Sequence, residues 1–153
     1  MNDDLKFRVW CRDRNEWEKH ECMLCPGGIV IHFNSRGIQT LLRPQEHIVE
    51  RCIGIPDRNK NLIYAGDVVE VEMMCDIPDG VTEGFSRAEK HKNGVYYFTK
   101  IRGAVEWKYA EFFVKLIDRK TNFDASFYDH MGDKFGWEQL EVIGNIHENP
   151  EFL

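Results

Sequence analysis

The sequence contains no run of roughly 18 apolar residues, the length that a helix needs to span a bilayer. It also lacks the basic and then apolar start of a signal peptide, because its first residues, Met1-Asn-Asp-Asp4, are acidic. Nor does it have the regularly paired cysteines of a disulfide framework, since its five cysteines are irregularly spaced and suit a reducing compartment. These absences predict a soluble, cytoplasmic protein.

Several signatures of enzymes and nucleic-acid-binding proteins are also missing. There is no Gly-rich phosphate loop, no Gly-x-Ser-x-Gly elbow and no His-Glu-x-x-His helix. The 20 Lys and Arg are outnumbered by 26 Asp and Glu, and the net charge of −6 argues against a broad phosphate-binding surface. What is present is 42% hydrophobic residues with ten Phe, four Trp and five Tyr, the composition of a globular chain. Its 153 residues suit one domain, alone or with a small satellite module.

The strongest local pattern lies between Gly54 and Val71, where a dense turn signal precedes a well-marked strand. Pro56-Asp57 begins a chain reversal, and Asn59 to Asn61 can adopt positive φ. Gly66-Asp67 then starts an alternating run that predicts a half-buried strand. The residues to which we assign structural roles here are Gly54, Asp57, Asn59, Tyr64, Gly66 and Asp67.

Before this stretch the sequence predicts a small antiparallel unit. Residues 6–10 alternate as a strand, residues 13–16 form a turn, and residues 17–23 can return as the second arm of a hairpin. A β-branched strand follows over residues 29–33. Residues 38–49 have no assignment, because Pro44 excludes a continuous helix and no clean period remains.

After this stretch, residues 75–94 are polar and rich in turn residues, and they predict an excursion from the β core that permits a short helix over 83–90. Residues 95–101 predict one strand, and residues 103–117 predict two strands about a turn near residues 108–111. A last strand over Leu140–Ile146, with a bulge or bend at Gly144-Asn145, is expected to pair with the core strand that begins at Gly66. Five or six short strands favour a barrel or sandwich.

Three blocks of the sequence resemble the YopX family, small proteins typically encoded by bacteriophages and prophages. Lys6-Phe-Arg-Val-Trp10 is similar to its N-terminal block, Gly54–Val69 to its central Gly-x-x-Asp-x-Asn-x-x-x-Ile-Tyr-x-Gly-Asp-x-Val block, and Glu141–Pro150 to its C-terminal block. The blocks occur in order and span nearly the whole chain. The chain differs at the central turn, where Asn59-Lys60 replaces the usual Asn-Gly, and at Ala65, where a Glu usually precedes Gly-Asp.

The resemblance implies a mainly β protein of the bacterial host cell, whose second part is similar to an SH3-like barrel and which forms homo-oligomers. It implies no catalytic residues and no cofactor. Combined with the patterns above, it divides the chain into an N-terminal β-hairpin unit over residues 1–50 and a barrel over residues 51–153, with an insertion at about residues 75–94.

Cys22-Met-Leu-Cys25, with His20 nearby, has the spacing of a zinc-binding pair. A closed structural site needs four ligands, however, and Cys11 and His32 belong to no partner motif. Ordinary reduced cysteines are therefore favoured over a metal site.

Asp57, Asp67 and His47 raise the alternative of acid–base or metal-assisted hydrolysis. A structural role is favoured, because each aspartate lies at a turn or strand start where its carboxylate can accept backbone N–H bonds. Tyr64 is likewise interpreted as a corner residue whose hydroxyl finds a partner.

Nucleic-acid binding is the main alternative to a protein-contact function, because small barrels bind single strands through exposed aromatics flanked by basic residues. A solvated loop followed by an amphipathic strand explains the same residues and is favoured by the net charge of −6. We therefore expect a non-enzymatic phage or prophage module that contacts itself and an unidentified phage or host protein. The candidate nucleic-acid contacts are Arg87, Lys90, Lys92, Tyr96, Tyr97, Lys100 and Arg102.

Overall fold

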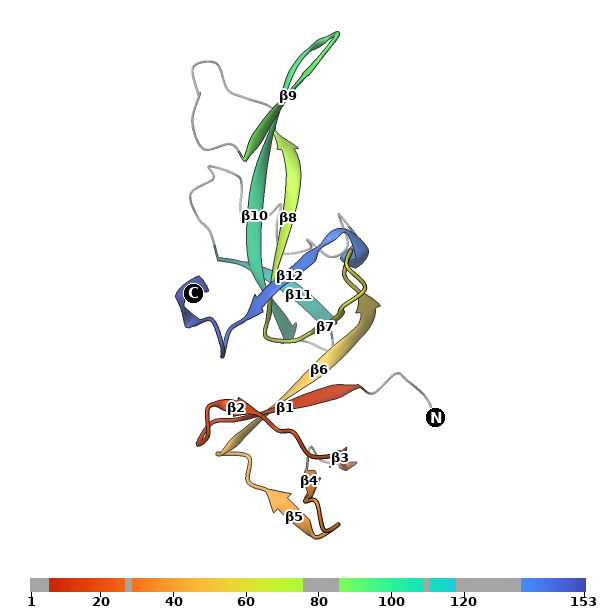
Figure 1. Cartoon of the computed structure of the whole chain (residues 1–153), viewed down its shortest axis with the longest axis vertical. Coiled ribbons are helices and arrows are strands. Elements are labelled where there is room, and N and C mark those ends of the chain that lie inside the picture. The colour runs from red at the N-terminus through yellow and green to blue at the C-terminus, as the bar shows by residue number, and fades with distance from the viewer. Residues whose placement is uncertain (1–5, 27–28, 76–85, 109–110, 118–135) are drawn as a thin grey trace.

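The structure is a computed structural model, and it describes residues 6–26, 29–75, 86–108, 111–117 and 136–153. Strands dominate these residues, so the chain is mainly β, as the sequence predicts. Figure 1 shows an elongated molecule with one hairpin at its upper end and a small sheet at its lower end. No helix within the described ranges is long and apolar enough to cross a membrane.

The N-terminal residues form a four-stranded antiparallel sheet in the order β2-β1-β6-β7. It consists of β1 (Phe7–Cys11), β2 (Glu16–Trp17), β6 (His47–Pro56) and β7 (Leu62–Tyr64). The predicted first strand and turn are confirmed, since Cys11 pairs with Glu16 and Asn15 adopts a φ of 52° between them. The returning arm is shorter than predicted and ends at Trp17. β6 runs through residues 50 and 51, so the boundary drawn there lies inside a strand.

A second, three-stranded sheet contains β3 (Cys22–Leu24), β4 (Val30–Phe33) and β5 (Gln39–Leu42). β5 lies in the segment that had no assignment from sequence. The turn before it explains the strand, because the Asn34 side-chain oxygen accepts the backbone N–H groups of Arg36 and Ile38 at 2.9 and 3.0 Å. Such Asx turns reverse the chain locally without any hydrophobic period. Pro44 lies in the break between β5 and β6.

The third sheet has the order β11-β10-β8-β12, with β9 paired to β10. Its strands are β8 (Asp67–Cys75), β9 (Arg87–His91), β10 (Gly94–Lys108), β11 (Glu111–Leu116) and β12 (Glu141–Asn145). The predicted pairing of the C-terminal strand with the core strand is confirmed, and the register shift between Val142 and Gly144 lies at the predicted bulge. These curled sheets are compatible with the SH3-like barrel that the resemblance implies.

Two predictions for this sheet were wrong. Residues 94–108 form one continuous strand rather than two. Residues 87–91, assigned to an excursion or short helix, form strand β9 instead. The reason is cross-strand contact, since Ser86 N–H donates to the Phe98 carbonyl at 2.7 Å and the Arg87 guanidinium lies 3.8 Å from the Phe98 ring centre. The rest of the proposed excursion, residues 76–85, and the aromatics after residue 118 lie outside the described residues.

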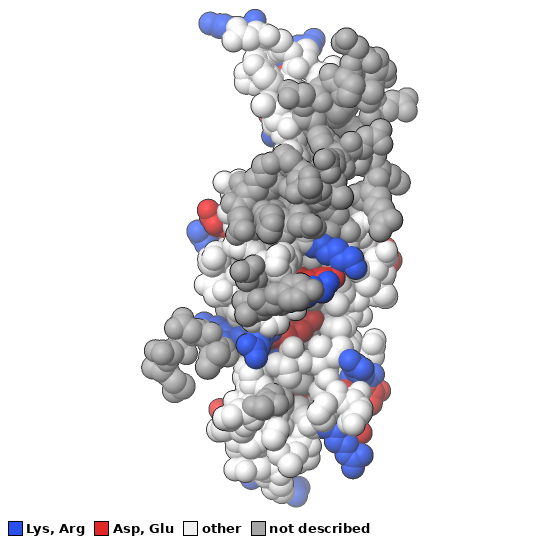
Figure 2. Space-filling view, turned by 180° about the vertical axis from the view of Figure 1, so that it is seen from behind, with Lys and Arg blue, Asp and Glu red and all other residues white. Residues whose placement is uncertain are grey.

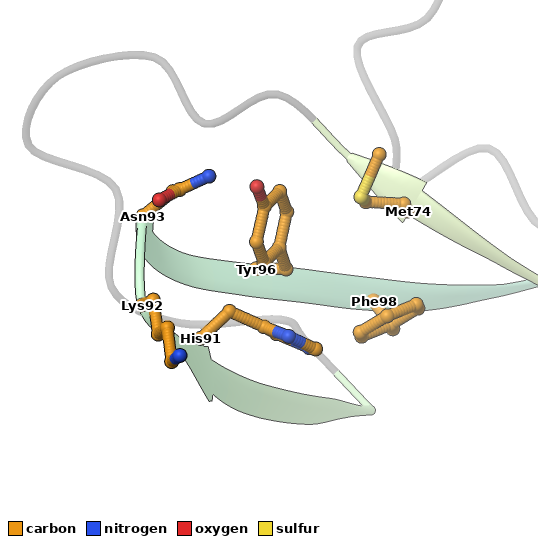
Figure 3. Close-up of a pocket in the computed structure, with 6 residues that line it drawn as sticks. All are labelled: Met74, His91, Lys92, Asn93, Tyr96 and Phe98. Carbon is orange, nitrogen blue, oxygen red and sulfur yellow. The ribbon is translucent and has the colours of Figure 1, made fainter.

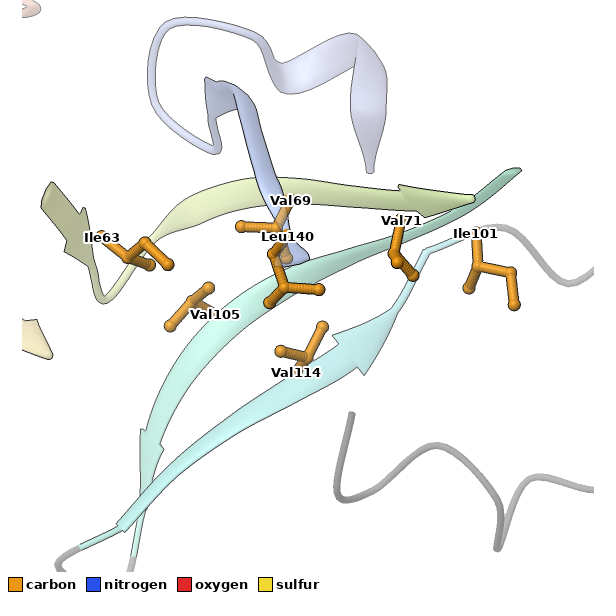
Figure 4. Close-up of a cluster of buried hydrophobic side chains, with 7 residues drawn as sticks. All are labelled: Ile63, Val69, Val71, Ile101, Val105, Val114 and Leu140. Carbon is orange, nitrogen blue, oxygen red and sulfur yellow. The ribbon is translucent and has the colours of Figure 1, made fainter. Parts of the chain in front are cut away.

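The hydrophobic core lies on one face of the third sheet, where alternate residues of β8, β10 and β11 meet β7 and the residue before β12 (Figure 4). Ile63 and Leu140 are fully buried between these strands. At about 1.5–3 kcal/mol for each fully buried aliphatic side chain, this cluster is a main source of the free energy of folding. Its members are Ile63, Val69, Val71, Ile101, Val105, Val114 and Leu140.

Candidate functional site

A buried polar junction connects the N-terminal sheet to the third sheet. Arg8 on β1 donates through Nε to Glu50 Oε2 at 2.8 Å and through Nη2 to Asp67 Oδ1. His147 Nε2 lies 2.9 Å from Glu50 Oε1, and Asn145 Nδ2 lies 3.3 Å from Glu50 Oε2 and 3.4 Å from Asp67 Oδ1. Arg8, Asp67 and Asn145 come from the three blocks that carry the family resemblance, so those blocks meet in space.

Aromatic rings enclose this junction. The Arg8 guanidinium lies 4.2 Å from the ring centre of Trp17 and 4.6 Å from that of Tyr64. The Trp10 ring stacks on His147, with their centres 5.1 Å apart. Flanking rings stabilise a cation electrostatically and exclude water from its ion pairs.

Burial governs the protonation of both junction carboxylates. Glu50 and Asp67 are 3% and 1% exposed. Desolvation raises the pKa of each carboxyl group, and the nearby Arg8 cation opposes that rise. Each of their four oxygens already contacts a protein group, including Asp67 Oδ2, which accepts the Tyr64 N–H at 2.8 Å. The junction therefore has the character of a structural centre rather than of an open acid–base site.

Sequence reasoning had assigned structural roles to Asp67, Tyr64 and Asn145 but had missed Arg8, Glu50 and His147. In an alternating strand, a charged residue is normally predicted to face solvent. This rule gives no reason to expect that Arg8 and Glu50 contact one another. The position of Arg8 and His147 inside the resembling blocks was the signal that could have found them.

The central turn is organised by Asp57, which is 1% exposed. Its Oδ1 accepts the backbone N–H groups of Asn59 and Asn61 at 2.9 and 2.8 Å, and its Oδ2 accepts the Val142 N–H at 3.0 Å. Lys60 adopts a φ of 70°, so this lysine takes the left-handed conformation at the place where the family usually has glycine. The turn is thus tied directly to the C-terminal strand.

Other residues of the central and C-terminal blocks support the same turn or its neighbours. The Asn59 side-chain amide donates to Glu141 Oε1 at 3.2 Å. Gly54 and Gly66 have φ values of 85° and 86°. Gly144 lies at the bulge in β12.

Replacing Asp57 by Asn is expected to make the free energy of unfolding depend less on pH below pH 6. Burial alone would raise the pKa of Asp57, but the N–H groups of Val142, Asn61 and Asn59 outweigh it and lower the pKa below its ordinary value. A carboxyl group with a lowered folded-state pKa stabilises the fold above its unfolded pKa of about 4, and that stability is lost as the pH falls through the folded value. Asp57→Asn should therefore cost about 1–3 kcal/mol near pH 7 and less at pH 3.

Urea denaturation at a series of pH values checks this expectation. Asn61→Ser is a suitable companion variant, because it keeps the Asp57 carboxylate and its backbone donors. If the wild type and Asp57→Asn lose stability in parallel from pH 6 to pH 3, Asp57 does not carry the acid dependence.

The three residues considered for hydrolysis have separate partners. Asp57 is held in its turn and Asp67 in the polar junction. His47, at the start of β6, lies with Nδ1 3.3 Å from the Arg43 carbonyl and belongs to a cluster with Cys11 and Glu18. The described contacts therefore give these residues no common site.

The residues considered for nucleic-acid binding divide between the two faces of the β9–β10 hairpin. Tyr96, Lys100 and Arg102 alternate on one face of β10, and Tyr97 lies on the other. Arg87, Lys100 and Arg102 are each paired with glutamates: Lys100 and Arg102 contact Glu70 at 2.5 and 2.8 Å, and Arg87 contacts Glu72 at 2.6 Å. Their positive charge is largely neutralised. In Figure 2, blue and red atoms form small mixed groups over the middle and lower described parts of the molecule, whereas mainly blue atoms lie at its upper end.

The tip of the same hairpin has a shallow groove of about 630 Å³ (Figure 3). Tyr96 and Phe98 project from β10 along it, and the His91 ring lies edge-on to Tyr96 with their centres 5.1 Å apart. Lys90 and Lys92 are exposed beside it. The groove is lined by Met74, His91, Lys92, Asn93, Tyr96 and Phe98.

Cys22 lies within β3, and strand alternation predicts that the side chain of Cys25, one residue beyond the strand, points to the opposite face of the three-stranded sheet. Cys22 pairs with His32, and the ladder continues to Cys25, whose N–H donates to the Ile29 carbonyl at 2.7 Å. Because side chains alternate along an extended strand, residues three apart point to opposite faces. The sequence spacing therefore does not produce a Cys-x-x-Cys chelate here, whereas Cys22 and His32 share a face.

The opposite side of that sheet carries a row of apolar side chains. Met23 pairs with Ile31, which pairs with Leu41, so one apolar row crosses all three strands. Met23 is 52% exposed and Leu41 66% exposed, which shows that the described residues leave this row uncovered. We call the following residues the outer face: Met23, Ile29, Ile31, Phe33, Gln39 and Leu41.

The fold and these sites define a mainly β protein in which a buried polar junction connects two sheets and a third sheet presents an exposed apolar row. Residues 6–153 match the family described as YopX protein, and the chain belongs to this family. Its fold is similar to the crystal structure of protein EF1440 from Enterococcus faecalis, with 19% identity, 97% of each chain covered and a TM-score of 0.50. No curated protein matches the sequence.

Proposed function

We propose that this YopX-family protein is a phage- or prophage-encoded accessory module without a catalytic site, which acts through protein contacts and self-associates through its outer face. The observation that carries the proposal is the exposed apolar row of Met23, Ile31 and Leu41 across β3, β4 and β5. Contiguous exposed apolar surface on a soluble protein is typical of an interaction site.

Charge favours a second copy as the occupant of this face. Two molecules that each carry a net charge of −6 repel one another over most of their surfaces. The apolar row of Met23, Ile31 and Leu41 contains no charged residue, and Glu21 lies only at the edge of the face, so two copies related by a two-fold axis can meet over this row without opposing like charges at its centre. Because the face is small, the dimer is expected to be weak and concentration-dependent.

Leu41→Glu is expected to weaken this self-association by at least tenfold. In a two-fold dimer the substitution places like charges in one apolar interface, and such contacts cost several kcal/mol. Sedimentation equilibrium over a range of protein concentrations measures the change. Met74→Glu is the matched control, because Met74 is 53% exposed and lies in the groove of the β9–β10 hairpin.

The control also separates the alternatives. Equal weakening by Leu41→Glu and Met74→Glu would show that the outer face is not the interface, and a wild type that stays monomeric at millimolar concentration would refute self-association. The nucleic-acid alternative is favoured by the Tyr96–Phe98 groove with Lys92 beside it. It would gain support if a single-stranded oligonucleotide bound with an affinity that falls steeply with salt.

A further inference from the structure

We propose that Glu18, His20 and His32 bind a divalent zinc-type cation, with Cys22 as the fourth ligand, and that this ion fastens the three-stranded sheet to the four-stranded sheet. The inference is independent of the proposed self-association, because these residues lie on or beside the inner side of the β3–β4–β5 sheet, away from the outer face.

Three potential ligand atoms already converge. Glu18 Oε1 lies 2.9 Å from His20 Nδ1 and 3.9 Å from His32 Nε2, and the cluster's ligand atoms all lie within 4.8 Å of one another. Ligands on a tetrahedral zinc ion with bonds of about 2.0–2.1 Å are separated by roughly 3.3 Å. The two measured distances lie on either side of that value, so small side-chain movements suffice to close the site.

His32 provides independent support, because its buried Nε2 atom lacks a hydrogen-bond partner among the described residues. This atom is inaccessible to solvent. Buried polar atoms of native proteins are normally satisfied, and an exception needs an explanation such as an ion. The atom lies close to Glu18 Oε1, where a cation would contact both.

Cys22 lies beside the cluster, but its Sγ is not one of the atoms that already lie within 4.8 Å of one another, so its side chain must turn toward the ion to become the fourth ligand. Cys22 pairs directly with His32, and Phe33 N–H donates to the Glu21 carbonyl at 2.9 Å. This hydrogen bond identifies Cys22 and His32 as a non-hydrogen-bonded pair, the class whose side chains lie closest together in an antiparallel sheet. Thiolate, carboxylate and two imidazoles form a neutral complex with a divalent zinc-type ion.

The other carboxylate oxygen of Glu18, Oε2, is already paired with the Arg14 guanidinium. Arg14 Nη2 lies 2.6 Å from Glu18 Oε2 and 2.7 Å from Cys11 Sγ. Arg14 therefore occupies the side of Glu18 that faces Cys11 and His47. The Oε1 side, with the two other histidines, is the side that we assign to the metal.

The position of the site explains why a metal would matter. Within β3, β4 and β5, Val30 is the single buried hydrophobic residue, so this sheet has little core of its own. Glu18 directly follows β2, and its N–H donates to the Val9 carbonyl of β1 at 2.8 Å, so it belongs with the four-stranded sheet. His20 lies in the link to β3, Cys22 lies on β3 and His32 lies on β4. An ion shared by these residues would cross-link two sheets, as structural zinc does in other small units with little core.

Titration of the full chain, stripped with EDTA, with zinc chloride tests the proposal. Calorimetry should show one site, and amide hydrogen exchange should slow in β3, β4 and β5 when zinc is added. His32→Gln should raise the zinc dissociation constant by at least the 10- to 100-fold typical of losing even an outer-shell partner. Cys25→Ser, which alters the cysteine on the opposite face, should leave binding unchanged.

Cobalt identifies the thiolate ligand. The cobalt-loaded wild type should show a sulfur-to-cobalt absorption band that Cys22→Ser removes and Cys25→Ser retains. Thermal unfolding in EDTA shows whether each variant folds; if His32→Gln is unfolded, His20→Gln supplies the ligand deletion. Absence of a stoichiometric site in the wild type, or binding that survives both histidine substitutions in folded variants, would overturn the proposal.

Discussion

A chain that ends at Trp137 is expected to be unfolded or insoluble, whereas a chain lacking only residues 151–153 should fold with a modest loss of stability. The longer deletion removes Leu140, a fully buried member of the core, and the whole of β12. β12 pairs with β8, so its loss leaves the backbone groups of β8 unpaired along one edge.

The deletion also removes partners from the rest of the chain. The Leu140 carbonyl accepts the Arg58 N–H at 2.9 Å, and Ile146 N–H donates to the Gly66 carbonyl at 2.9 Å. Asp57 loses its bond from Val142, and the polar junction loses both Asn145 and His147. Three buried carboxylates therefore lose some of their partners, which costs more than the loss of the contacts alone.

The magnitudes support complete unfolding. Burial of Leu140, together with the half-buried aliphatic residues of β12 and Ile146, contributes about 5 kcal/mol. That amount is comparable with the roughly 5–15 kcal/mol net stability of a whole domain. Near-ultraviolet circular dichroism and thermal melting of both truncations measure the outcome. A soluble Trp137 truncation that melts cooperatively would show that the sheet forms without β12, and it would leave that strand free to contact a partner.

The C-terminal strand could be predicted from the sequence because its information is local. Leu140, Val142 and Ile146 recur at even spacing, and Gly144-Asn145 marks the bulge that the structure contains. The first strand and its turn could be predicted for the same reason. By contrast, β9 lacks an apolar period and depends on Phe98 of the neighbouring strand, so its own sequence did not reveal it.

The polar junction was not predicted because its residues lie far apart in the sequence. Arg8 and Glu50 are 42 residues apart, and Glu50 and His147 are 97 residues apart. The histidine cluster spans only residues 18–32 and was missed for a different reason. In the histidine cluster, the recognisable spacing of Cys22 and Cys25 indicated the wrong pair, because strand alternation separates the two thiols. His32, the residue with the unsatisfied nitrogen, belongs to no motif in the sequence.

Gly66→Val is expected to lower the melting temperature by about 10–20 °C, far more than the same substitution at Gly54. Both glycines adopt nearly the same left-handed conformation, with φ values of 86° and 85°. A side chain in this region costs about 1–2 kcal/mol at either position. The two positions differ in their surroundings, since a Cβ at Gly54 meets nothing within 4 Å, whereas a Cβ at Gly66 overlaps the Glu50 carboxylate.

The overlap is costly because Glu50 cannot move without breaking the polar junction. Its oxygens contact Arg8, Asn145 and His147, and its side chain is almost fully buried. Disrupting a buried ion pair in this way costs about 3–5 kcal/mol, and each kcal/mol lowers the melting temperature of a domain of this size by about 2–4 °C. Thermal unfolding followed by circular dichroism compares Gly66→Val with Gly54→Val. The difference between the two melting temperatures isolates the contribution of the junction from the shared backbone strain, and equal losses would show that Glu50 is free to leave its partners.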